Sequence, residues 1–216
     1  MKNQRRSVRT IALTLLAAAA LSACAPLLLG GAVVGGVMLA TDRRTSGTII
    51  EDEAIELKAL SRTREALGER GGVNVTSFNR VVLISGDVAS EADKKLVEQV
   101  VSRIDNVKSV VNELVVGLSR TVIARSRDAL LTSKVKASLV DAKDLFANSI
   151  KVVTAHESVY LMGRVTEREA TRAADVARGV EGVRKVVRVF EVVPEGEISR
   201  TQPRVAPVSG APAPGR

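Results

Sequence analysis

The sequence is poor in the residue types that usually carry catalysis, metal binding and base stacking. Its 216 residues include one cysteine, Cys24, and one histidine, His156, with no tryptophan and only 2% aromatic residues. Without a second cysteine there is no intramolecular disulfide, so stability has to come from apolar packing. The sequence therefore offers too few cysteine and histidine side chains for a typical zinc site or for a nucleophile–base pair. We interpret His156 as a solvated turn residue, and we expect neither enzyme activity nor a metal or cofactor.

The residues before Cys24 predict a cleaved and lipidated N-terminus. Four basic residues come first, namely Lys2, Arg5, Arg6 and Arg9. An apolar run at residues 11–21 leads into Leu21-Ser22-Ala23-Cys24, which resembles a bacterial lipobox. In a lipobox the bond before the cysteine is cleaved and the thiol carries a diacylglycerol. The run falls short of the roughly 20 residues that span a bilayer, and an ordinary signal peptide is the alternative. We predict a signal peptide at residues 1–23 and lipid attachment at Cys24.

Cleavage would remove much of the positive charge. The formal net charge is +8, and residues 1–23 carry four basic and no acidic side chains, so the predicted mature chain has a net charge of +4. A secreted compartment and a near absence of aromatic residues argue against nucleic acid as a partner.

Composition separates the two ends of the mature chain from its centre. Residues 24–47 are predicted to be a Gly-rich leader and linker beside the lipid surface. Residues 195–216 hold four of the six prolines, and we expect a disordered tail there, because this composition buries too little apolar area to offset the ordering entropy.

The centre contains an internal repeat. Residues 73–76 align with residues 150–153, and residues 82–86 with residues 159–163, at an offset of 77. The apolar periodicity predicts the order αββαβ in each copy. The expected first helices are residues 51–68 and 127–142, the strands are 73–78, 81–85 and 107–116 in the first copy and 149–155, 158–162 and 183–193 in the second, and the second helices follow the N-caps Ser90 and Thr166.

These elements predict an α+β fold of two tandem domains. Each domain has its helices on one face of a small mixed sheet. The expected bounds are 48–117 and 126–194, with a linker at residues 118–125 too short to let the domains tumble freely. Gly86 and Gly163 are predicted to turn each strand towards the following helix, since glycine tolerates unusual backbone angles.

Several segments together resemble the BON domain, and the whole chain is similar to dual-BON outer-membrane lipoproteins of the DolP type. They are the lipobox, Ala40-Thr41-Asp42-Arg43-Arg44-Thr45 with Gly47-Thr48, Val73-Asn74-Val75-Thr76, Val110-Val111-Asn112-Glu113, Tyr160-Leu161-Met162-Gly163 and Val165-Thr166-Glu167-Arg168-Glu169-Ala170. The resemblance implies a lipid-anchored protein on the periplasmic side of the outer membrane. It also implies a role in envelope integrity and binding of anionic phospholipid through the first helix of the second domain. Ala25, rather than aspartate, follows the cysteine, which favours the outer over the inner membrane.

The charges of the two domains agree with that implication. Residues 48–116 hold nine Lys/Arg and twelve Asp/Glu, and residues 126–193 hold twelve and nine, so the net charges are −3 and +3. In the first helix of the second domain, Leu130 and Leu131 precede Lys134 and Lys136. Leucines that insert beside lysines that snorkel would suit a membrane interface. Leu131 also fits a core position, because it shares a four-residue spacing with Val135 and Leu139.

A protein-interaction adaptor is the alternative function. In that hypothesis the sheet edges or the Pro-rich tail hold an outer-membrane assembly or cell-wall protein. The sequence leaves both hypotheses open.

Overall fold

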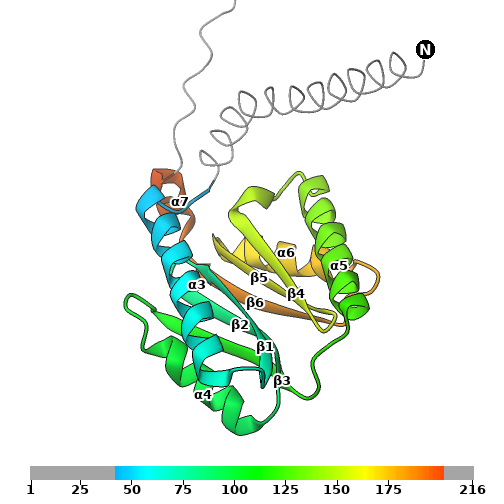
Figure 1. Ribbon diagram of the computed structural model, residues 1–216. Coiled ribbons are helices and arrows are strands. Elements are labelled where there is room, and N and C mark those ends of the chain that lie inside the picture. Colours follow the sequence, from blue (N-terminus) through cyan, green and yellow to red (C-terminus); the bar gives the residue numbers. More distant parts are fainter. Residues whose placement is uncertain (1–41, 202–216) are drawn as a thin grey trace, which may run out of the picture. The chain divides into compact units, whose positions relative to one another are not determined.

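The computed structural model describes residues 42–201, which form two αββαβ units in tandem (Figure 1). The first domain consists of α3 Ser46–Leu67, β1 Gly71–Phe78, β2 Val81–Val88, α4 Glu91–Ser102 and β3 Ser109–Val116. The second consists of α5 Val122–Asp141, the short 3-10 helix η1 Ala147–Ser149, β4 Ile150–Ala155, β5 Ser158–Val165, α6 Glu167–Arg178 and β6 Lys185–Val192, and α7 Glu195–Thr201 follows it. The predicted α+β fold is confirmed. The predicted signal peptide and Cys24 lie outside the described residues.

The two sheets have the same mixed topology. In each, the middle strand pairs antiparallel with the strand before it and parallel with the strand after α4 or α6. Ser90 and Thr166 cap α4 and α6 as predicted, each accepting a hydrogen bond from the backbone three residues on. Within residues 42–201, no helix combines the length and the apolar composition needed to cross a membrane.

Each middle strand is apolar on both faces. In β2, Val82 and Ile84 pack in the core with α3 and α4, while Leu83 points the other way. Leu83 shares a third cluster with Tyr160 and Met162 of β5. Successive side chains of a strand alternate between faces, so the helices cover one face of each sheet and the opposite faces meet each other. The expectation that the two domains touch is confirmed.

The ends of several elements differ from the predictions. Helices α3 and α5 begin at Ser46 and Val122, five residues earlier than expected, after the N-caps Thr45 and Thr121. Part of each predicted linker is therefore helical. Residues 195–201, assigned to a disordered tail, form α7, and residues 202–216 lie outside the described residues.

Gly86 and Gly163 do not end their strands as expected, since β2 and β5 continue to Val88 and Val165. Glycine is needed at both positions because the backbone of a neighbouring segment approaches too closely for a side chain. A Cβ on Gly86 would lie 2.0 Å from the carbonyl oxygen of Gly72, and Gly86 has a φ of +124°. A Cβ on Gly163 would lie 2.6 Å from the carbonyl oxygen of Ser149.

His156 lies in the β4–β5 turn as predicted, but it is not a freely solvated side chain. Its Nε2 lies 2.9 Å from Oδ1 of Asp87 in the first domain, and 27% of the side chain is exposed. The residue thus contributes to the contact between the domains.

Candidate functional site

Helix α5 is the element to which the sequence assigned lipid binding, and one side of it is buried. Leu131, Val135 and Leu139 are at most 7% exposed. Thr132 on the same side hydrogen-bonds the Thr154 hydroxyl of β4 at 2.7 Å. Leu131 was a candidate for lipid contact, and the structure corrects that assignment, because the side chain is part of the domain interior.

The opposite side of α5 exposes large apolar side chains, which we call the α5 outer face. Its members are Val122, 76% exposed, Ile123, 68%, Leu130, 65%, and Val140, 65%. Ile123 and Leu130 are seven residues apart, two turns of helix, so they project in the same direction. Leu130 therefore lies where the sequence hypothesis needs it.

Exposed cations flank the α5 outer face. Arg127 and Lys134 are two turns apart on one flank, and Arg125 and Lys136 are three turns apart on the other. All four are exposed, whereas Asp141 is the sole exposed acidic residue of the helix. An apolar strip between two cationic flanks is the arrangement of helices that lie in a membrane interface.

The corresponding helix of the first domain differs in charge. Helix α3 also exposes apolar side chains, Ile50 at 67% and Leu57 at 69%. It contains five acidic and three basic residues, whereas α5 contains two and four. Of the two first helices, α5 is thus the one suited to an anionic surface.

A repeated Arg–Asp pair fixes α3 and α5 to their sheets. Asp128 of α5 accepts the backbone amides of His156 and Glu157 at 3.1 and 3.0 Å, and Arg120 binds the same carboxylate. In the first domain Asp52 accepts the amides of Asn79 and Arg80 at 2.8 Å, and Arg44 binds it at 2.8 Å. The arginine precedes the aspartate by eight residues in both copies. The aspartates satisfy the amides of hairpin turns whose two residues have positive φ.

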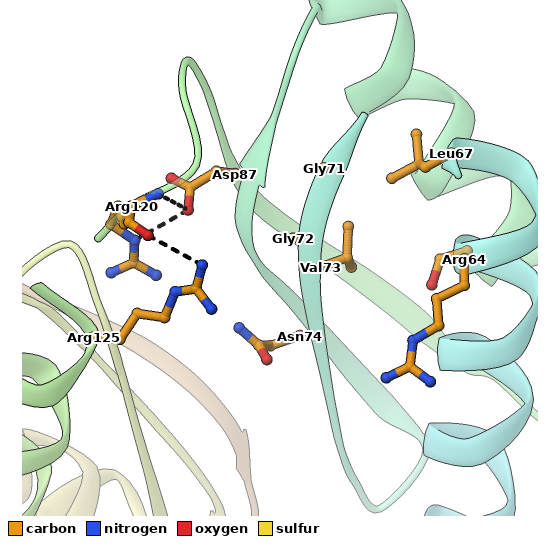
Figure 2. A pocket seen from close by; sticks show the side chains of 10 residues that line it. Arg64, Leu67, Gly71, Gly72, Val73, Asn74, Asp87, Arg120 and Arg125 are labelled. Carbon is orange, nitrogen blue, oxygen red and sulfur yellow. Dashed lines mark hydrogen bonds and ion pairs between the residues drawn. The ribbon is translucent and has the colours of Figure 1, made fainter. Parts of the chain in front are cut away.

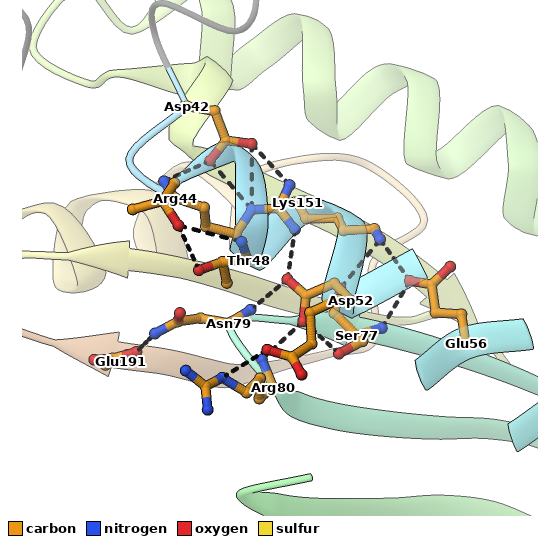
Figure 3. Close-up of polar contacts among 12 residues, drawn as sticks. Asp42, Arg44, Thr48, Asp52, Glu56, Ser77, Asn79, Arg80, Lys151 and Glu191 are labelled. Atoms are coloured by element: carbon orange, nitrogen blue, oxygen red, sulfur yellow. Dashed lines mark hydrogen bonds and ion pairs between the residues drawn. The ribbon is translucent and has the colours of Figure 1, made fainter. Parts of the chain in front are cut away.

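These contacts set the ionisation of Asp52. Burial alone would raise the pKa of this carboxyl group, but hydrogen bonds from the Ser77 hydroxyl, the Arg80 amide and Arg44 outweigh burial and lower the pKa. Figure 3 shows this network, in which Asp42 also pairs with Arg44. In addition, Nζ of Lys151 in β4 lies 2.9 Å from Oε1 of Glu56 in α3. The network joins the two domains at this edge.

Arg43, next to Arg44, contacts the second domain instead. It makes a bidentate pair with Glu169 of α6 at 2.8 Å, and both side chains are 4% exposed. Its guanidinium also lies 5.3 Å from the centre of the Phe146 ring. Burial would raise the pKa of Glu169, but hydrogen bonds from Arg43 and from the Thr166 amide lower it. The sequence hypothesis noted Asp42-Arg43-Arg44 within a family motif but gave neither arginine a role.

Within residues 42–201 the structure brings together no group of three metal-ligating side chains. The candidate residues Leu130, Lys134 and Lys136 share the exposed surface of α5, while Leu131 is buried and Cys24 lies outside the described residues.

Comparison with known proteins identifies both domains. The chain matches the BON domain family at residues 52–117 and 127–194. It is 34% identical over 187 residues to the outer membrane lipoprotein DolP of Haemophilus influenzae, covering 85% of this chain and 96% of that protein. It is 30% identical over 154 residues to a 21 kDa hemolysin of Actinobacillus pleuropneumoniae, covering 70% and 79%. A 60-residue stretch is 43% identical to osmotically-inducible protein Y of Escherichia coli, covering 27% of this chain and 30% of that protein.

Proposed function

The chain belongs to the BON-domain family as a dual-BON outer-membrane lipoprotein of the DolP type, and on this basis we propose that its second domain binds anionic phospholipid through the α5 outer face. The observation that carries the proposal is the exposure of Leu130 and Ile123 between two flanks of exposed lysine and arginine. In this proposal the apolar side chains enter the headgroup–acyl boundary and the cations meet lipid phosphates.

In this proposal the acyl chains attach the protein to the membrane, and the α5 cations recognise the lipid. We propose that Cys24 carries the lipid, whose acyl chains supply about 0.8 kcal/mol per buried CH₂ and dominate attachment. Each cation of α5 adds about 1 kcal/mol near an anionic surface. The anchor keeps the second domain at high effective concentration beside the bilayer, so even a weak α5 contact is populated. Through this contact the protein would contribute to envelope integrity.

Vesicle co-sedimentation of the mature chain carrying Cys24→Ser tests the proposal, because without acyl chains only the protein surface can bind. We expect pelleting with phosphatidylglycerol vesicles and not with phosphatidylcholine vesicles. Leu130→Glu should reduce binding about tenfold or more, because it removes a leucine insertion of about 1.5 kcal/mol and adds a repelled charge.

Leu57→Glu is the matched control. It places the same charge on an equally exposed leucine of α3, and it should leave binding unchanged. If neither vesicle pellets the protein, or if the two variants weaken binding equally, the α5 proposal is wrong. Absence of pelleting together with capture of a defined envelope protein would favour the adaptor alternative.

A further inference from the structure

A second candidate site lies beside one cationic flank of the α5 outer face, in a cleft of about 250 Å³ (Figure 2). The residues that line it come from the C-terminal end of α3, from β1 and β2, and from the start of the second domain. Its polar lining consists chiefly of Arg64, Asn74, Asp87, Arg120 and Arg125. Pockets for drug-sized ligands have volumes of roughly 300–1,000 Å³, so this cleft suits a compact group.

Arg64 and Arg125 are not paired with acidic side chains within the described residues. Within residues 42–201, Arg64 makes no side-chain ion pair or hydrogen bond, and Arg125 donates only to the backbone carbonyl of Arg120 at 3.1 Å. Figure 2 shows the Arg125 side chain and the Asn74 amide on one side of β1, with the Arg64 side chain on the other side, next to α3. The Asn74 amide is exposed and makes no hydrogen bond within the same residues. Three donor groups from three elements therefore line one cleft.

The acidic side chain of the cleft is already paired with an arginine. Asp87 is 5% exposed, and Arg120 contacts its Oδ2 through Nε at 3.2 Å. Arg120 also binds Asp128. Arg64, Arg120 and Arg125 together with Asp87 and the neighbouring Asp128 have a net charge of +1.

We propose that this cleft binds a phosphate group. A carboxylate is planar and is matched by one bidentate arginine, whereas a tetrahedral phosphate offers oxygens to donors arriving from different directions. Arg64, Arg125 and Asn74 offer such donors from α3, α5 and β1. The phosphate could be part of a phospholipid headgroup or could be free, and in either case the donors are the same. The site shares Arg125 with one cationic flank of the α5 outer face, but it does not depend on the apolar residues there.

Nuclear magnetic resonance titration of the mature chain carrying Cys24→Ser tests the proposal at constant ionic strength. The probes are inorganic phosphate, soluble dihexanoyl-phosphatidylglycerol and acetate. We expect saturable shifts of the Arg64 and Arg125 Nε–H signals and of the Asn74 side-chain amide with phosphate. Shifts with phosphate alone would identify a free phosphate as the source, and shared shifts with the lipid would identify a headgroup.

Arg64→Gln should weaken phosphate binding about fivefold or more. Arg62→Gln is the matched control, because it removes the same charge from an exposed arginine of α3 that does not line the cleft. Equal weakening by both variants, equal affinity for acetate, or no shift at the three side chains would overturn the proposal. Leu130→Glu should leave the titration unchanged, so failure of the α5 proposal and failure of this one give different results.

Discussion

Arg43 and Glu169 are the residues at which a single substitution should have the clearest energetic effect. Both charges are buried, and each is satisfied by the other. Arg43→Ala leaves the glutamate buried without its partner, which should lower the free energy of unfolding by about 3–5 kcal/mol. Chemical denaturation of the mature chain measures this loss.

Two further variants define the cause of that loss. Arg178→Ala removes an exposed arginine that pairs with Asp175, and it should cost less than about 0.5 kcal/mol. The double variant Arg43→Met with Glu169→Gln should recover much of the stability, because neither charge is then buried alone and the glutamine oxygen can still accept from the Thr166 amide. Wild-type stability of Arg43→Ala would contradict this account of the pair.

A second prediction at the scale of single residues concerns the effect of a side chain at Gly86 on stability. Gly86→Ala would place a Cβ 2.0 Å from the Gly72 carbonyl oxygen at a φ of +124°, so we expect a loss of roughly 2–4 kcal/mol. Gly72→Ala is the control, because a Cβ there meets nothing within 4 Å, and it should change stability by less than about 1 kcal/mol. Thermal and urea unfolding of the two variants compare them directly, and similar stabilities would refute the close-approach explanation.

At the scale of elements, the charge of α5 should control vesicle binding. Replacing Lys134 and Lys136 by glutamine removes two cations worth about 1 kcal/mol each at an anionic surface, which corresponds to about 30-fold weaker binding at low salt. High salt screens the same interaction, so the difference from wild type should shrink as salt rises. Co-sedimentation with phosphatidylglycerol vesicles at two salt concentrations measures both effects.

The matched variant for that experiment is Lys58→Gln with Arg62→Gln on α3. It removes the same number of charges from exposed positions of the other first helix. Binding should remain close to wild type. A salt-sensitive loss of the same size would show that overall charge, rather than the position of the cations on α5, determines binding.

The helices also show what the sequence could and could not predict. The core side of α5 followed from the apolar spacing of Leu131, Val135 and Leu139. The helix starts did not, because α3 and α5 have no acidic residue in the first turn, which is a common signal of a helix N-terminus. The same spacing favoured a core position for Leu131, which the structure shows to be buried, and it left Leu130 on the exposed side of α5.

For the molecule as a whole, long-range contacts were the part that the sequence did not reveal. Arg43 and Glu169 are 126 residues apart, and no local pattern connects them. The cleft at Arg64 and Arg125 depends in the same way on segments from both domains. The packing of sheet on sheet did leave a local signal, because residues 81–84 and 159–162 are continuous apolar runs, which is typical of strands buried on both faces.

Adjacent arginines at the start of the described chain bind different domains, and this arrangement should make the whole molecule sensitive to acid. Arg43 binds Glu169 of the second domain and Arg44 binds Asp52 of the first. Both carboxyl groups have pKa values lowered in the folded state, from 4.5 for Glu169 and 3.8 for Asp52. Their contribution to stability is therefore complete above those values and is lost as the pH falls through the lower folded pKa values.

We expect the free energy of unfolding to fall as the pH is lowered from about 5 towards 3, as measured by urea unfolding at a series of pH values. Asp52→Asn should be less stable than wild type at pH 7, because Arg44 loses a charged partner, yet its stability should depend less on pH over this interval. Glu53→Gln, at an exposed neighbouring position of α3, should retain the wild-type profile. An Asp52→Asn profile parallel to that of the wild type would show that the Arg44–Asp52 contact does not contribute to acid sensitivity, and the pairing with both domains would then have no measurable role in it.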